Sequence, residues 1–320
     1  MILQSPGEER RDSLTDRFNL GLIIVPRVFL YNEPGGPSDS RGIGPQTDEV
    51  FSGWAVELLE KDRKNWVRIR THYGYEGWMR AAAIRPLTAE ALLTRQDGIQ
   101  HPRVADSWMD FHAEPSVRGE ILTCLPRGSI VERLSEPERD GWIRLRSADG
   151  TEGWCQPDSL RERLDDDLFL LEGRGSRAWF RRRGLEKLRR MNEEKIREAV
   201  VRSAMSRLGT PYRWGGKSPE GIDCSGLAFM SWMENGILIW RDAAILPDYP
   251  MQPIDRQQLK KGDLIFFPGH VAIYTGGGRY IHATAYRKTP RVTVNSLNPE
   301  DPDYRPDLAG SITAFGSSFV

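Results

Sequence analysis

The chain lacks long apolar runs, has few cysteines and carries no excess of charge of either sign. No stretch of about 18 apolar residues occurs, so we expect no transmembrane helix. Its 45 basic and 45 acidic residues balance, which argues against a protein that coats nucleic acid, because such proteins carry a basic excess. Three cysteines, Cys124, Cys155 and Cys224, are too few and odd in number for a disulfide framework. No Cys/His group has the spacing of a zinc site, and the sequence implies no metal or organic cofactor.

The length of 320 residues suits about two domains, or about three small ones. Residues 1–19 form a separate charged N-terminal segment that lacks the apolar core of a secretory signal. We therefore expect a cytoplasmic protein if this N-terminus is native, and a secreted or cell-envelope protein if a signal peptide has been removed. The oligomeric state stays open.

A sequence repeat with an offset of 76 residues occupies the first half of the chain. The stretch KNWVRIRTHYGYEGWM (64–79) aligns with DGWIRLRSADGTEGWC (140–155). In both stretches apolar and polar residues alternate as in a strand, and a glycine turn leads to a second short strand. We expect two small all-β barrels, over 20–87 and 99–160. These units resemble bacterial SH3-like (SH3b) domains, whose strand pair ends in a similar Gly-x-x-Gly-Trp.

Residues 161–192 differ in character from the repeats. The stretch 177–190 carries seven basic residues and one acidic residue. Such a run can contact an anion or a wall polymer, but it more often belongs to a solvated linker or helix face. We interpret 161–192 as a basic linker.

From residue 193 the pattern becomes helical and then extended. Apolar residues recur at helical spacing between 196 and 208, and a second helix is predicted from Cys224, with Asp223 as its N-cap, to Asn235. The segment 262–286 alternates between strands and glycine-rich turns. Helices followed by antiparallel strands indicate an α+β domain over 193–320.

Three residues of this domain could perform nucleophilic catalysis. A cysteine at a helix N-terminus, such as Cys224, is favoured as a thiolate by the helix dipole, although a lone cysteine is more often a buried apolar residue. His270 and His282 flank a predicted hairpin. A turn centred on Gly276 would pair His270 with His282 and Tyr274 with Gly278, so that both imidazoles stand on one sheet face. A nucleophile, a base and an orienting group are what such catalysis requires.

Five motifs carry a family resemblance in this domain, namely 211–216 (PYRWGG), 223–227 (DCSGL), 262–267 (GDLIFF), 269–274 (GHVAIY) and 280–283 (YIHA). In their order and spacing they resemble the NlpC/P60 family of papain-like cysteine peptidases, in which helices pack on an antiparallel sheet. The resemblance implies that Cys224 is the nucleophile, His270 the base and His282 its orienting group. It also implies that Tyr212 and Asp223 shape the acyl-side pocket, with Ser225 beside the nucleophile, and the N–H of Cys224 is a candidate oxyanion donor.

Tandem SH3b units before such a domain resemble dipeptidyl-peptidase VI-like enzymes. These are γ-D-glutamyl-L-diamino acid endopeptidases that act on muropeptides with a free N-terminal L-Ala. The stretch 239–243 (IWRDA) resembles their Leu-Pro-Arg-Asp-Ala motif, with Trp240 in place of proline. An enclosed ammonium needs carboxylate partners, and the candidates are Asp223, Asp242 and Glu76. Glu76 can equally be a plain surface carboxylate, because its repeat copy Glu152 cannot share the role.

The expected partner is therefore a peptidoglycan peptide, L-Ala-γ-D-Glu-diamino acid, whose third residue, meso-diaminopimelate or Lys, the sequence leaves open. Two other functions also stay open. One is a non-catalytic module that binds wall peptide, against which the intact Cys/His/His set argues. The other is a papain-like acyltransferase or amidase, which uses the same thiol chemistry with a different acceptor.

Overall fold

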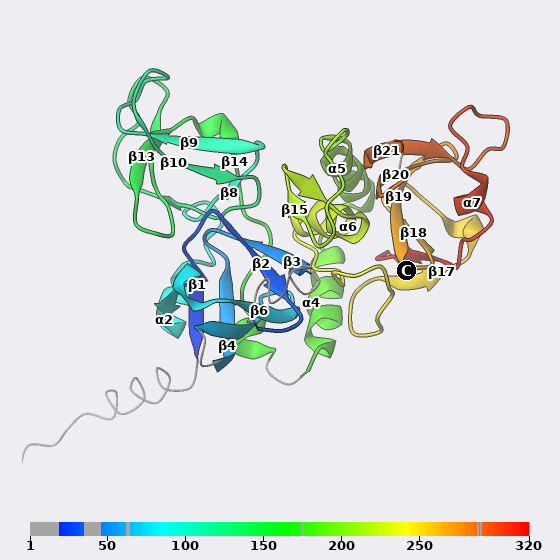
Figure 1. Cartoon of the computed structure of the whole chain (residues 1–320), viewed down its shortest axis with the longest axis horizontal. Coiled ribbons are helices and arrows are strands. Elements are labelled where there is room, and N and C mark those ends of the chain that lie inside the picture. Colours follow the sequence, from blue (N-terminus) through cyan, green and yellow to red (C-terminus); the bar gives the residue numbers. More distant parts are fainter. Residues whose placement is uncertain are drawn as a thin grey trace, which may run out of the picture. The chain divides into compact units, whose positions relative to one another are not determined.

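The computed structural model describes residues 19–34, 46–61, 65–173, 176–286, 288 and 290–319. The predicted N-terminal segment, except Asn19, lies outside these residues. The chain divides into two compact units, Met1–Arg174 and Gly175–Val320 (Figure 1), and each is described by itself.

The first sequence copy forms an antiparallel sheet with the strand order β3-β2-β6-β5-β4-β1-β7. Its buried residues alternate along the strands, as in β5, where Val67 and Ile69 are buried and Arg68 is exposed. The strands are β1 (Leu20–Ile23), β2 (Arg27–Tyr31), β3 (Gln46–Phe51), β4 (Ala55–Lys61), β5 (Trp66–Thr71), β6 (Glu76–Arg80) and β7 (Ile84–Leu87). A 3-10 turn, η1 (Ala81–Ala83), precedes β7, and the helix α2 (Ala89–Thr94) follows it.

The second copy repeats this order in two pieces, β10-β9-β13-β12-β11 and β14-β8. Its elements are β8 (Arg103–Val104), β9 (Trp108–His112), β10 (Ile121–Pro126), β11 (Glu132–Arg133), β12 (Ile143–Arg146), β13 (Glu152–Cys155), η2 (Pro157–Ser159) and β14 (Leu160–Arg161). Cys155 is fully buried in its apolar core, beside Phe111 and Leu145. The predicted all-β repeats are thus confirmed.

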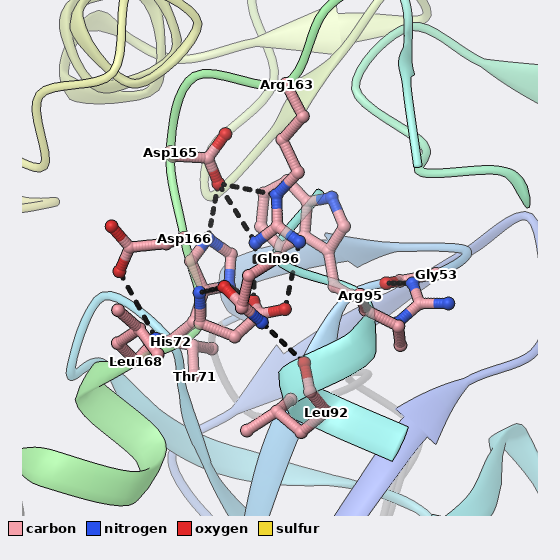
Figure 2. Close-up of polar contacts among 12 residues, drawn as sticks. Gly53, Thr71, His72, Leu92, Arg95, Gln96, Arg163, Asp165, Asp166 and Leu168 are labelled. Atoms are coloured by element: carbon pink, nitrogen blue, oxygen red, sulfur yellow. Dashed lines mark hydrogen bonds and ion pairs between the residues drawn. The ribbon is translucent and has the colours of Figure 1, made fainter. Parts of the chain in front are cut away.

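Hydrogen bonds and buried charges join the two copies within the N-terminal unit. Trp54 Nε1 of the first copy donates to the carbonyl of Gly128 in the second at 2.8 Å. The segment that follows β14 carries Arg163, which is 4% exposed and pairs with Asp165 (Figure 2). Arg163 also pairs with Asp167. The helix α3 (Phe169–Glu172) ends this unit.

This buried cluster also contacts the first copy. The imidazole of His72, which is fully buried, lies 3.5 Å from an Asp165 oxygen (Figure 2), and Arg103 pairs with the same carboxylate. Burial alone would raise the pKa of Asp165, but the charges of Arg103 and Arg163 hold it well below its usual range. A buried carboxylate stays ionised only with such partners, so the segment after β14 is a fixed part of the unit.

The C-terminal unit is an α+β domain built on a six-stranded antiparallel sheet, in the order β17-β22-β18-β19-β20-β21. Its helices are α4 (Ala178–Leu188), α5 (Glu193–Met205), α6 (Cys224–Met233) and α7 (Pro306–Ala309), with the 3-10 turn η3 (Arg256–Gln258). Its strands are β15 (Lys217–Ser218), β16 (Gly221–Ile222), β17 (Gln252–Ile254), β18 (Leu264–Phe267), β19 (His270–Gly276), β20 (Arg279–Thr284), β21 (Arg291–Ser296) and β22 (Ala314–Ser317). α6 packs on β19 and β20, and α5 packs on α6. The predicted fold class is confirmed.

The segment interpreted as a basic linker contains α4, which packs on this unit. The ring of Phe180 is buried and stacks on Tyr249 with a centroid distance of 4.7 Å. The side chains of Arg181 and Arg182 are exposed. The basic run is therefore the solvated face of a packed helix.

Candidate active site

Cys224 is the first residue of α6, and the local sequence explains why the helix begins there. Asp223 has an extended backbone, and its carboxylate accepts a hydrogen bond from the Gly226 N–H at 2.6 Å, as an N-cap does. A Cβ on Gly226 would lie 2.3 Å from the carbonyl oxygen of Gly216, so this position requires glycine. Every residue of α6 is buried, which fits its apolar composition.

The two histidines come from adjacent strands, but the predicted hairpin register is wrong. Tyr274 pairs with Tyr280, not with Gly278, and a bulge interrupts the register before Gly276 pairs with Arg279. Three consecutive glycines, 276–278, adopt positive φ angles of 91°, 61° and 75° in the turn, so the turn lies further along the chain than predicted.

The error amounts to two residues, and side chains in a strand return to the same face every two residues. His270 and His282 therefore share one face as predicted, as diagonal rather than direct neighbours. His270 Nε2 lies 2.7 Å from His282 Nδ1. His282 is fully buried.

A third side chain continues this line of hydrogen bonds. Asn295 on β21 places its Oδ1 2.9 Å from His282 Nε2. Asn295 was not among the site residues predicted from the sequence. A signal was present, because Val292 and Val294 alternate with Thr293 and Asn295 as in a strand with one polar face.

Cys224 lies beside the strand that carries His270. The backbone N–H of Val271, the residue after His270, is near enough to the Cys224 sulfur to favour the thiolate and so oppose the rise of the Cys224 pKa. The Cys224 residue is 6% exposed. The structure therefore brings the predicted nucleophile to the start of β19, where the predicted base also lies.

Protonation of these groups differs from the expectation based on the helix dipole. Burial, followed by the charge of Asp223, raises the pKa of Cys224 to about 11, although the N–H groups of Val271 and Ser225 oppose the shift. Burial, with His282 and Arg305, lowers the pKa of His270 to about 3. Both shifts favour the neutral forms, a thiol and an uncharged imidazole, because the loss of water outweighs the dipole of the helix.

Asp223 is also half of a buried ion pair. Arg241, which is 1% exposed, donates to both carboxylate oxygens, at 3.0 and 3.1 Å, and to Ser225 Oγ at 2.8 Å. The N–H of Gly215 donates to the second oxygen at 2.7 Å. The charge of Asp223 is thus matched within the protein.

A small pocket adjoins the start of α6. Ser225 and Asp242 line it together with Ile239, Trp240 and Val271. Two of the predicted binding residues, Ser225 and Asp242, are therefore brought together, and Asp242 is exposed.

Tyr212 lies near the same helix end. Burial raises the pKa of the Tyr212 hydroxyl, and the neighbouring Cys224 and Asp223 raise it further, so Tyr212 stays a neutral donor. Among the described residues no group of three His, Cys, Asp or Glu side chains could hold a metal ion. Within the same residues, no helix combines the length and apolar character needed to cross a membrane.

Glu76 lies in the N-terminal unit, and its role at the acyl side stays a prediction. Its carboxylate pairs with Arg68 and Arg70, at 2.8 Å each. The repeat copy Glu152 makes the equivalent pairs with Arg144 and Arg146, so both copies use this glutamate to join two arginines on a neighbouring strand.

Comparisons with known proteins agree with this geometry. A model of the NlpC/P60 family matches residues 209–302, and a bacterial SH3 domain model matches residues 110–161. Dipeptidyl-peptidase 6 of Lysinibacillus sphaericus is 34% identical over 301 residues, which cover 93% of this chain and 99% of that protein. A γ-D-glutamyl-L-lysine dipeptidyl-peptidase of Bacillus cereus is 33% identical over 147 residues, 43% of each chain. The crystal structure of an NlpC/P60 family protein from Bacillus cereus shares the fold, with a TM-score of 0.66, 20% identity and coverage of 92% of this chain and 98% of that one.

Proposed function

Because the chain belongs to the NlpC/P60 family of peptidases, we propose that it hydrolyses the bond between γ-D-glutamate and the L-diamino acid of peptidoglycan-derived peptides that begin with a free L-Ala. The chain is a cysteine peptidase with bacterial SH3 domains before its catalytic domain. The observation that carries the finer proposal is the similarity to dipeptidyl-peptidase 6, which extends over 99% of that protein and includes both SH3-like copies.

In the proposed reaction the Cys224 sulfur attacks the γ-carbonyl carbon of D-glutamate. His270 takes the thiol proton as the sulfur–carbon bond forms, and it returns that proton to the α-amine of the diamino acid as the carbon–nitrogen bond breaks. A water molecule then attacks the thioester, His270 accepts its proton, and the sulfur leaves to regain a proton. His282 holds the His270 ring throughout.

The developing oxyanion needs preorganised donors. The backbone N–H of Cys224 at the start of α6 is one candidate, and the neutral hydroxyl of Tyr212 near the nucleophile is a second. The proximity of Tyr212 to Cys224 supports this assignment.

Recognition of the free L-Ala amine requires negative charge near the acyl side. The charge of Asp223 is matched by Arg241, so we assign recognition of the amine to Asp242, whose carboxylate lines the pocket with Ser225. Asp223 then contributes hydrogen-bond acceptors to the site but no net negative charge. Glu76 remains a further candidate from the N-terminal unit.

The test compares L-Ala-γ-D-Glu-L-Lys, its meso-diaminopimelate counterpart and the N-acetylated lysine peptide, with products identified by mass spectrometry. We expect release of L-Ala-γ-D-Glu and the free diamino acid. Acetylation removes a charged hydrogen-bonding group, each such bond being worth about 1.5–3 kcal/mol, and adds bulk, so kcat/KM should fall by about a hundredfold or more.

Each alternative gives a different result in this assay. No cleavage of any peptide, with binding retained, would favour a non-catalytic module. Transfer of the dipeptide to an added amine in preference to water would favour an acyltransferase. Equal cleavage of the free and acetylated peptides would refute the requirement for a free amine.

A further inference from the structure

A hydrogen-bonded line of side chains extends behind the proposed base and ends on a backbone carbonyl. It runs from His270 Nε2 to His282 Nδ1 at 2.7 Å, from His282 Nε2 to Asn295 Oδ1 at 2.9 Å, and from Asn295 Nδ2 to the Asp303 carbonyl at 2.6 Å. We propose that Asn295 is a positioning residue that sets the tautomers of both histidines and so leaves His270 Nδ1 free to accept the proton of Cys224.

The strand register places Asn295 where this role requires it. In the β20–β21 pair Thr293 lies opposite His282 and Asn295 lies opposite Tyr280. Residues opposite one another, or two positions apart, share a sheet face. Asn295 is therefore a diagonal neighbour of His282 on the face that carries both imidazoles.

The orientation of the Asn295 amide follows from its second partner. A backbone carbonyl can only accept a hydrogen bond, so the amide atom 2.6 Å from the Asp303 oxygen must be the NH₂ group. The atom that faces His282 is then the amide oxygen. The carbonyl of Asp303 is itself held in place, because the Asp303 side chain pairs with Arg279 and Tyr304 bridges to Ser296.

The tautomers follow in sequence from this fixed oxygen. His282 Nε2 must carry a proton to donate to Asn295, and a neutral imidazole has only one N–H, so His282 Nδ1 is an acceptor. His270 Nε2 must then be the donor to it. That leaves the lone pair of His270 on Nδ1, the nitrogen that His282 does not occupy.

This assignment of tautomers applies when both imidazole rings are neutral. Burial lowers the pKa of His282 to about 4, although its hydrogen bond to Asn295 opposes the shift. Two charged groups act on the pair. Arg305 lowers the pKa values of both histidines, and Asp307 raises the pKa of His282. A neutral pair has two possible tautomers at each ring, and only one combination both makes the hydrogen bond between His270 and His282 and leaves the lone pair of His270 on Nδ1.

The test measures the tautomers directly in the intact chain. The sequence contains five histidines, so ¹⁵N-histidine labelling gives five imidazole signal sets, and single His→Gln variants assign them. At pH 7.5 we expect the Nε2–H tautomer at both His270 and His282. The Nδ1–H tautomer at either ring in the wild type would overturn the proposal, whatever the behaviour of the variants.

Asn295→Leu keeps a similar volume and removes the acceptor. We expect a mixed or Nδ1–H signal at His282, and a fall in kcat of about ten- to a hundredfold with KM little changed, since one hydrogen bond sets the tautomer ratio and Asn295 does not contact substrate. Unchanged tautomers in this variant would refute the proposal. Thr293→Val, on the same face of the same strand, is the matched control and should change neither tautomers nor kcat.

Asn295→Asp separates positioning from simple packing. It keeps an oxygen toward His282 but adds a charge that stabilises imidazolium, so the Nε2–H of His282 should persist and the acid limb of the kcat/KM profile should move to higher pH. A profile with the wild-type acid limb would count against Asn295 acting through His282. The measurements of kcat and kcat/KM rest on the proposed function, whereas the tautomer measurement needs no substrate. An error in the proposed function is therefore distinguishable from an error in the role of Asn295.

Discussion

The buried Asp223–Arg241 pair at the start of α6 provides a quantitative test of how the candidate site is held. Arg241 is 1% exposed and contacts both oxygens of Asp223. Removing one partner of a buried pair leaves an uncompensated charge and costs about 3–5 kcal/mol. We therefore expect Arg241→Met to destabilise α6 by that amount.

Hydrogen exchange of the α6 amides in the intact chain, followed by mass spectrometry, is the appropriate assay, because a chain of two units need not unfold in one step. A loss of about 3–5 kcal/mol corresponds to exchange about two to four powers of ten faster. Arg202→Met is the control. Arg202 is exposed on α5 and lies 3.8 Å from Glu198, and such a pair is worth at most about 0.5 kcal/mol.

The double variant Asp223→Asn with Arg241→Met separates charge from capping. Asparagine still caps the helix, and neither charge remains, so most of the lost protection should return. A loss below about 1 kcal/mol in Arg241→Met alone would refute the reasoning, because it would mean that the pair is solvated enough to be dispensable. Failure of the double variant to recover protection would assign the effect to packing.

Three further outcomes follow from the site. Cys224→Ala should abolish turnover and leave the melting temperature nearly unchanged. Iodoacetamide should label Cys224 faster than Cys124, whose pKa burial raises to about 12, and faster than the fully buried Cys155. Equal labelling of the three cysteines would contradict an accessible nucleophile. His270→Ala should lower kcat/KM more than His282→Gln, since an amide can still orient the base; the reverse order would exchange their roles. The folded pKa values of His270 and His282, about 3 and 4, lie below the unfolded value near 6.5, so the unfolded chain binds more protons below pH 6.5. The free energy of unfolding should therefore fall as the pH decreases from 6.5 toward 4. A midpoint of denaturation that does not change with pH in that range would contradict this expectation.

The sequence predicted the elements that depend on local patterns. The repeat predicted two β copies because strand alternation and turn glycines are local features, and η1 and η2 begin 76 residues apart, as the repeat offset requires. Asp223 predicted the start of α6 because an N-cap acts within one helical turn. The face shared by His270 and His282 was predicted despite a wrong register, because an even shift preserves the face.

What the sequence did not predict depends on the burial that the whole domain creates. A helix N-terminus favours a thiolate when it is considered alone, whereas the packing of α6 on β19 and β20 removes the water that a thiolate needs. Asn295 was missed for a related reason. The position of Asn295 beside His282 depends on how β20 pairs with β21. The sequence between these two strands does not fix where the chain turns, so it does not fix that pairing.

The protonation of the free site links these features. A neutral thiol is a poor nucleophile, so a cysteine whose pKa lies near 11 depends on a base that takes its proton as the substrate carbonyl is attacked. Such a site cannot rely on a resting thiolate–imidazolium pair. It needs a base whose free lone pair already faces the thiol, because the energy of reorienting an imidazole in a dry site would add to the barrier. A fixed hydrogen-bonded line behind His270 and a charge-matched Asp223 at the start of α6 both reduce that reorganisation, which is why the tautomers of the two histidines are the most informative quantities to measure in this protein.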